Sequence, residues 1–166
     1  MSARPDISIL QATPADYLAI LELNDDAIPA VNSIPETKLA HLHRQSAYLG
    51  VARIDDEIAG FLLALPETAD YDSINFGYFR RHYPRFTYID RIVIGLRHRG
   101  TGLGGRLYED LQRHVGPNCA MLACEVNLRP PNPHSLAFHQ RLGFEALGEQ
   151  DTEGGSKRVC LMAKRF

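Results

Sequence analysis

A run of glycines between a strand pattern and a helix pattern constrains this chain more than any other feature. The run is Arg99-Gly-Thr-Gly-Leu-Gly104. Before it, residues 86–94 are rich in β-branched and aromatic residues, which predicts a strand. After it, apolar residues recur at helical spacing, at Leu103, Leu107, Leu111 and Val115. The chain must therefore turn from a strand into a helix through backbone that carries few side chains.

The glycine turn has the features of an anion-binding site. The first N–H groups of a helix have no partner within the helix, and the helix dipole makes that end positive. Glycines let the backbone approach a ligand closely, and Arg99 adds a permanent charge. We expect a phosphate group here; the alternative is a tight turn with a solvated arginine.

Composition limits the class of protein. The chain has 166 residues, 45% hydrophobic and 23% charged, enough for one domain with a real core. A net charge of −2 argues against a general nucleic-acid or membrane-surface binder. The three cysteines form no C-x-x-C pair, and neither a leader segment nor a run of about 18 apolar residues is present. We expect a cytoplasmic protein with unpaired thiols.

Strands and helices are expected to alternate along the chain. Two pairs of strand patterns flank short polar turns, 48–54 with 58–65 and 144–150 with 157–165, and each pair predicts a hairpin. Further strands are expected at 7–11 and 119–126, and further helices at 13–26, 36–47 and 132–142. Hairpins combined with a crossover helix indicate a mixed α/β sheet.

Residues 68–85 form a long connection in which tyrosines and phenylalanines alternate with arginines. Their spacing fits neither a strand nor a helix, and long loops in compact domains are usually functional. We expect a lid with Tyr78 and Arg81 on the acceptor side of a pocket; the alternative is a loop that only covers the sheet. His41 and His43 lie two residues apart, which argues against a metal pair, and no metal is expected.

A dinucleotide site is a competing interpretation of the glycines. Gly100, Gly102 and Gly105 fit G-x-G-x-x-G, and Glu125 lies twenty residues farther on. However, that motif opens a large parallel sheet, whereas only about sixty residues remain here and they end in a hairpin. A Walker A loop is excluded because no Gly-Lys-Ser/Thr follows.

Two motifs together resemble a family. A strand followed by Arg99-x-x-Gly102-x-Gly104 is similar to the acetyl-CoA motif of the GNAT N-acetyltransferases. The later run from Asn132 to Phe144 resembles the family's N-x-x-A-x-x-x-Y-x-x-x-G-F helix, with Ser135 at the small position and His139 in place of tyrosine. The resemblance covers nearly the whole chain. It implies a single domain over residues 1–166 with a central mixed, largely antiparallel sheet flanked by about four helices.

The resemblance implies acetyl transfer from acetyl-CoA, the acyl donor substrate, to an amine. The glycine turn would hold the CoA pyrophosphate, the end of the strand would hold the pantetheine arm and thioester carbonyl, and Asn132 would contact that arm or merely cap its helix. The implied donor-binding residues are Ile92, Val93, Ile94, Arg99, Gly100, Thr101, Gly102, Leu103, Gly104 and Asn132.

Four side chains are candidates for proton transfer and acceptor binding. By the resemblance, His139 would protonate the leaving thiolate, although a surface role is its alternative. Asp90 is our first choice for the base, with a surface ion pair to Arg91 as the alternative. Tyr88 and Glu125 lie on strands expected to border the cleft and are assigned to acceptor binding.

The acceptor is expected to be a small amine, anionic or aromatic, such as an amino acid. An inactive acyl-CoA-binding sensor is the alternative function. No nucleic acid or membrane is expected as a partner, and a homodimer is left open.

Overall fold

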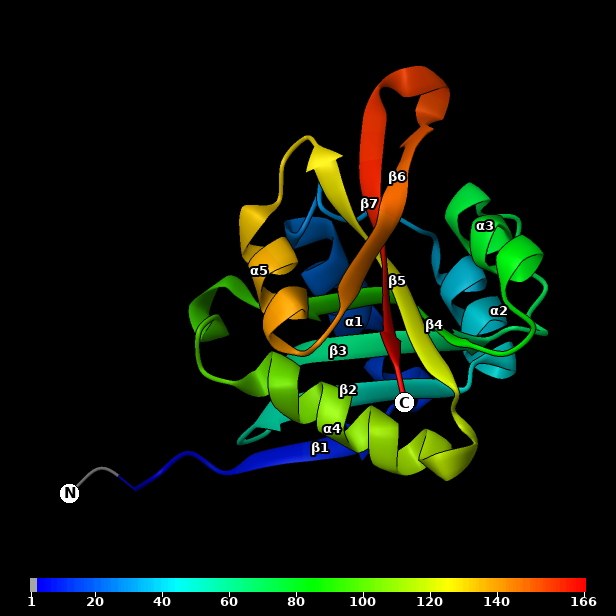
Figure 1. Ribbon diagram of the computed structural model, residues 1–166. Coiled ribbons are helices and arrows are strands. Elements are labelled where there is room, and N and C mark those ends of the chain that lie inside the picture. Colours follow the sequence, from blue (N-terminus) through cyan, green and yellow to red (C-terminus); the bar gives the residue numbers. More distant parts are fainter. Residues whose placement is uncertain (1–2) are drawn as a thin grey trace. The chain divides into compact units, whose positions relative to one another are not determined.

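The computed structural model describes residues 3–166. The seven strands of this part of the chain form one mixed sheet in the order β1-β2-β3-β4-β5-β7-β6, and its helical segments include five α-helices (Figure 1). The expected α/β class and the largely antiparallel sheet are confirmed, with five helices instead of about four. The chain divides into two compact units, and β4 contributes to both. A single domain over residues 1–166 stays a prediction.

The first unit runs to Ala64 and resumes at Asp90–Gly116. Strand β1 pairs antiparallel with β2, and β2 pairs antiparallel with β3 in the expected hairpin. In Figure 1, α4 crosses in front of β1 and β2, whereas α1 lies behind the strands. The elements are β1 (Ile7–Gln11), α1 (Tyr17–Asp26), α2 (Glu36–Gln45), β2 (Tyr48–Ile54), nearly all of β3 (Glu57–Pro66), the end of β4 (Thr87–Ile94) and α4 (Leu103–Val115).

Tyr48 connects the sheet of this unit to α4. Its ring fills the space above Gly50, where a Cβ atom would overlap the ring. Its hydroxyl donates a 2.8 Å hydrogen bond to Oδ2 of Asp110 on α4. Burial and this bond raise the pKa of Tyr48, so the phenol stays protonated and keeps donating. The start of β2 is thereby fixed to the helix that follows the glycine turn.

The second unit holds Leu65–Ile89 and Pro117–Phe166. Strand β4 pairs in parallel with β5 at Thr87–Leu122 and Tyr88–Ala123, and β7 pairs antiparallel with β5 and β6. The hairpin expected near the C-terminus is confirmed. The elements are α3 (Ile74–His82), the start of β4, β5 (Met121–Arg129), α5 (Pro133–Arg141), β6 (Glu145–Thr152) and β7 (Lys157–Arg165).

Helix α3 corrects the expectation of an irregular connection at residues 68–85. Its N-cap is Ser73, whose hydroxyl accepts from the N–H of Phe76. Phe76 and Phe79, three residues apart, are fully buried against Phe86 and Tyr88. The expectation was wrong because the apolar face spans one helical turn, too short to produce a recognisable period. None of the helices in residues 3–166 combines the length and apolar character that crossing a membrane requires.

Candidate active site

The glycine turn adopts the conformation that its sequence predicts. Gly100 and Gly102 have positive φ values of 74° and 85°, and Gly102 is the N-cap of the 13-residue helix α4. A Cβ atom added at either position would meet nothing within 4 Å, so both glycines border open space. The turn therefore offers a ligand unobstructed backbone at the positive end of a helix.

Local hydrogen bonds hold this turn at the end of β4. Nε of Arg99 donates to the carbonyl of Ile94 at 3.3 Å, and the hydroxyl of Thr101 donates to the carbonyl of His98. The N–H of Gly95 donates to the carbonyl of Ala59 on β3 at 2.8 Å. The turn is therefore tied to the sheet before any ligand binds.

The end of β4 lies unusually close to β3. A Cβ atom at Gly60 would lie 2.8 Å from the carbonyl oxygen of Val93 and 2.7 Å from Cδ1 of Ile94. Val93 is buried, while Ile92 and Ile94 are half-buried. A side chain at position 60 would push β4 away, so Gly60 sets the position of the three residues proposed to hold the pantetheine arm.

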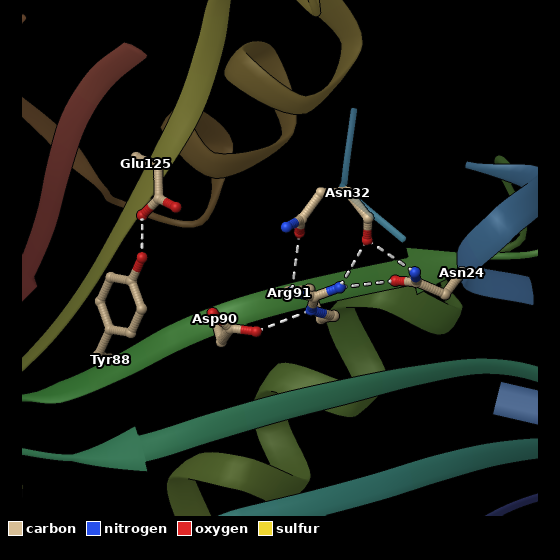
Figure 2. A network of polar contacts seen from close by, with 6 residues as sticks. All are labelled: Asn24, Asn32, Tyr88, Asp90, Arg91 and Glu125. Carbon is tan, nitrogen blue, oxygen red and sulfur yellow. Dashed lines mark hydrogen bonds and ion pairs between the residues drawn. The ribbon is translucent and has the colours of Figure 1, made fainter. Parts of the chain in front are cut away.

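Asp90 is paired with its neighbour Arg91 in a buried site. Nε of Arg91 donates to Oδ2 of Asp90 at 2.7 Å, and both side chains are 3% exposed. The remaining guanidinium nitrogens bind Asn24 at the end of α1 and Asn32 in the α1–α2 connection (Figure 2). The alternative of a surface ion pair is wrong, because the pair is enclosed.

Tyr88 and Glu125 form a hydrogen-bonded pair in the second unit. The hydroxyl of Tyr88 donates to Oε2 of Glu125 at 2.6 Å (Figure 2). The Tyr88 ring is fully buried, with an edge contact to Phe76 and a tilted contact to Tyr71, whereas Glu125 is half-buried. Strands β4 and β5 position the two groups, and the aromatic side chains fix the direction of the phenol.

Asn132 caps α5, as its sequence predicts. Its side-chain oxygen accepts from the N–H of Ser135 at 3.3 Å, with Pro133 at the first helical position. The capping alternative is thus confirmed for Asn132, and contact with a pantetheine arm stays a prediction.

His139, on the same helix, is 3% exposed. Its Nδ1 lies 2.8 Å from the carbonyl oxygen of Ser135, and its ring contacts the edges of Phe138 and Phe144. The alternative of a solvated surface histidine is wrong. Burial lowers the pKa of His139, although the bond to Ser135 partly opposes this effect. A carbonyl oxygen only accepts, so neutral His139 carries its proton on Nδ1 and a lone pair on Nε2.

Tyr78 and Arg81 lie on the outer side of α3. Tyr78 stacks on His82 with ring centroids 4.3 Å apart and is half-buried, while Arg81 is exposed. Both residues lie on a helix and not on the expected loop, and a lid over a pocket stays a prediction. Acceptor binding by these two side chains stays a prediction.

Each unit brings together part of the predicted site. The first contains Asp90, Ile92–Ile94 and Arg99–Gly104; the second contains Tyr88, Glu125, Asn132, His139 and the residues of α3. Sequence reasoning missed Gly60, Asn24 and Asn32, and it treated Arg91 only as a surface partner. An arginine inside an apolar strand was the one signal for that cluster. Among residues 3–166, no three His, Cys, Asp or Glu side chains gather in a way that could hold a metal ion.

Comparison with known proteins agrees with this geometry. The model of the acetyltransferase (GNAT) family matches residues 17–144. A spermine/spermidine N(1)-acetyltransferase of Bacillus subtilis is 30% identical over 67 residues, which are 40% of this chain and 44% of that relative.

Solved structures share the fold. Ard1 from Thermoplasma volcanium has a TM-score of 0.77 at 15% identity, covering 96% of this chain and 97% of that one. Naa50 of Arabidopsis thaliana, in complex with the bisubstrate analogue CoA-Ac-MVNAL, has a TM-score of 0.72 at 16% identity, covering 96% and 99%. The resemblance stated from the two motifs is confirmed, and the chain belongs to the acetyltransferase (GNAT) family.

Proposed function

We propose that the protein is an N-acetyltransferase that moves the acetyl group of acetyl-CoA to the amine of a small molecule, by direct attack within a ternary complex. The observation that carries the proposal is the open backbone of Gly100 and Gly102 at the start of α4, next to the end of β4. The first N–H groups of α4 and Arg99 suit a pyrophosphate, and the neighbouring strand suits an extended amide chain. The CoA analogue bound to Naa50 supports the choice of donor.

The acceptor must lose a proton before it can attack. Either carboxylate could take that proton: Asp90 in the first unit or Glu125 in the second. Oδ2 of Asp90 accepts a charge-assisted bond from a guanidinium, which is about twice as strong as a neutral bond. Glu125 accepts from a neutral phenol and is half-buried. Glu125 is therefore the better proton acceptor, and Asp90 is the second candidate.

The reaction then forms a bond between the amine nitrogen and the thioester carbonyl carbon, and the carbon–sulfur bond breaks. The carboxylate keeps the proton that the ammonium lost before the attack. The attacking nitrogen then loses its second proton, which balances the proton that the CoA thiolate takes up to become the thiol. His139 can supply that proton only as the imidazolium, because neutral His139 has its proton on Nδ1, bound to Ser135. A lowered pKa makes this imidazolium scarce at neutral pH, so proximity must supply most of the rate, up to about 7–11 kcal/mol in well-oriented cases.

Helix α3 supports the choice of acceptor class. Its last turn carries Arg80, Arg81 and His82, all exposed, which favours an amine that also bears a carboxylate. The Bacillus subtilis relative is named for spermine and spermidine, and the name of the analogue bound to Naa50 includes the sequence MVNAL. The competing acceptors are therefore a polyamine and a peptide with a free N-terminus.

The decisive experiment measures free thiol released from acetyl-CoA with three groups of amines: amino acids, spermidine, and a peptide with a free N-terminus. We expect turnover with an amino acid or a similar small amine. Release of thiol with the peptide alone would contradict a small-molecule acceptor. Tight acetyl-CoA binding without release for any amine would favour the sensor.

A further inference from the structure

Arg91 has no role in the reaction as described above, yet it is a buried cation with several hydrogen bonds in the first unit. Arg91 is 5% exposed, and all three of its guanidinium nitrogens donate hydrogen bonds (Figure 2). Burying a guanidinium costs several kcal/mol unless good partners compensate it. A buried arginine in a strand is therefore a feature that needs a reason beyond packing.

The bonds of Arg91 converge on the connection between α1 and α2. Nη1 donates to the carbonyl of Asn32 at 3.0 Å, and Nη2 donates to Oδ1 of the same residue at 3.2 Å. Nη1 also donates to Oδ1 of Asn24, whose Nδ2 in turn donates to the carbonyl of Asn32 at 2.9 Å. Asn24 is 1% exposed. Asn32 is thus held from two elements at once.

The connection has no helix or strand of its own from residue 27 to residue 35. Ile34 is buried, but Ile28, Asn32 and Ser33 are exposed. Its course therefore depends on a few anchoring bonds, of which those to Arg91 reach the sheet. Arg91 also precedes Ile92–Ile94, the residues proposed to hold the thioester. An anchor at position 91 keeps residues 27–35 beside the strand to which an acceptor amine must come.

We propose that Arg91 is a positioning residue that holds residues 27–35 as a wall of the acceptor site and so sets the affinity for the amine. This inference rests on the proposed function. The planar fork of arginine matches the paired oxygens of Asn32, whereas lysine offers a single point charge. Lysine would keep the ion pair with Asp90 but lose the simultaneous bonds to Asn24 and Asn32.

The test compares Arg91→Lys and Asn32→Ala with wild type. Asn32 is exposed, and Asn32→Ala removes the Oδ1 bond while leaving the carbonyl bonds, so this variant folds even where Arg91→Lys does not. The control is Arg113→Lys in the last turn of α4, where the arginine side chain is 74% exposed and pairs with Asp110. The steady-state probes are acetyl-CoA with each amine of the panel that wild type acetylates. Amide hydrogen exchange of residues 31–33 is measured on the same samples.

In Arg91→Lys we expect the KM for the amine to rise about tenfold and the KM for acetyl-CoA to change less than twofold. Exchange of residues 31–33 should become faster, Asn32→Ala should show a smaller effect in the same direction, and Arg113→Lys should match wild type. A residue that serves only stability would shift both KM values together or neither, and that result would overturn the inference. Wild type that acetylates no amine overturns the proposed function instead, whereas an active wild type with unchanged variants overturns only the role of Arg91.

Discussion

The phenol of Tyr88 donates a 2.6 Å hydrogen bond to Glu125, so a fully buried ring directs its hydroxyl at a half-buried carboxylate. If Glu125 takes the proton of the acceptor, Glu125→Gln should lower kcat about 10²–10⁴-fold, since the amide keeps the shape but does not accept a proton. Asp90→Asn is the matched variant and should lower kcat less. A larger loss in Asp90→Asn would return the role of base to Asp90.

Replacement of Gly102 should weaken donor binding. A valine at φ 85° is strained, and its side chain would occupy the open space in front of the turn. We expect the Kd for CoA, measured by titration calorimetry, to rise at least about tenfold in Gly102→Val, because even one lost charge-assisted bond has that effect. Gly116→Val, at φ 69° beyond the other end of α4, controls for strain and should bind CoA normally. Unchanged affinity in folded Gly102→Val would contradict the pyrophosphate assignment.

Substitutions on α3 test the acceptor side. Tyr78→Ala and Arg81→Gln should raise the KM for the amine by up to about tenfold and leave the KM for acetyl-CoA nearly unchanged, since one bond to a charged group is lost. Arg113→Gln, also a last-turn arginine of a helix, is the control. Equal shifts for both substrates would argue against a dedicated acceptor surface on α3.

The pH profile of kcat tests His139. Burial lowers its pKa, so the imidazolium is lost as pH rises through a value below its ordinary one. If imidazolium protonates the thiolate, kcat should fall on the alkaline side of that value, and His139→Tyr should move the fall toward the tyrosine range, near 10. A loss below about tenfold in His139→Ala with an unchanged profile would mean that His139 only packs against Phe138 and Phe144.

Stability should depend on pH through the same histidine. Because the folded pKa of His139 lies below the unfolded value, the unfolded state binds the proton first as pH falls. The free energy of unfolding should therefore be highest above the unfolded pKa of about 6.5 and should decrease as pH falls toward the folded pKa. Burial also lowers the pKa of His43, so His43 adds to this dependence of stability on pH. Denaturant titrations at several pH values should show that the free energy of unfolding depends less steeply on pH in His139→Leu than in wild type. An equal dependence on pH would refute the assignment.

Local signals explain why much of the fold was predictable. The cap at Asn132-Pro133 and the glycines before α4 act on neighbouring backbone, so a short stretch of sequence contains all the information. The hairpins likewise depend on adjacent strands and the turn between them. Helix α3 was missed because its buried face consists of Phe76 and Phe79 alone, while Tyr78, Arg80 and Arg81 between and beside them hide the period.

The site was less predictable because its side chains meet across long stretches of chain. Arg91 bonds Asn24 and Asn32, which are 67 and 59 residues away, and Tyr88 bonds Glu125, 37 residues away. A sequence pattern specifies which face of a strand a residue occupies, but not what lies opposite it. The burial of His139 was missed for a local reason: part of its cover comes from Phe144, which lies beyond the end of α5 and so outside the helical pattern.

Tyr48 and Gly50 share one volume of space, because the ring of the first occupies the place of a side chain on the second. A substitution at one of these two positions therefore affects which residues the other can hold. An alanine at position 50 becomes tolerable only after the ring at 48 has been exchanged for a shorter side chain, and that exchange removes the bond to Asp110. If position 50 changes first, its new side chain overlaps the Tyr48 ring, and if position 48 changes first, Asp110 on α4 loses its bond to the phenol. The pair therefore restricts which neighbouring sequences this protein can reach.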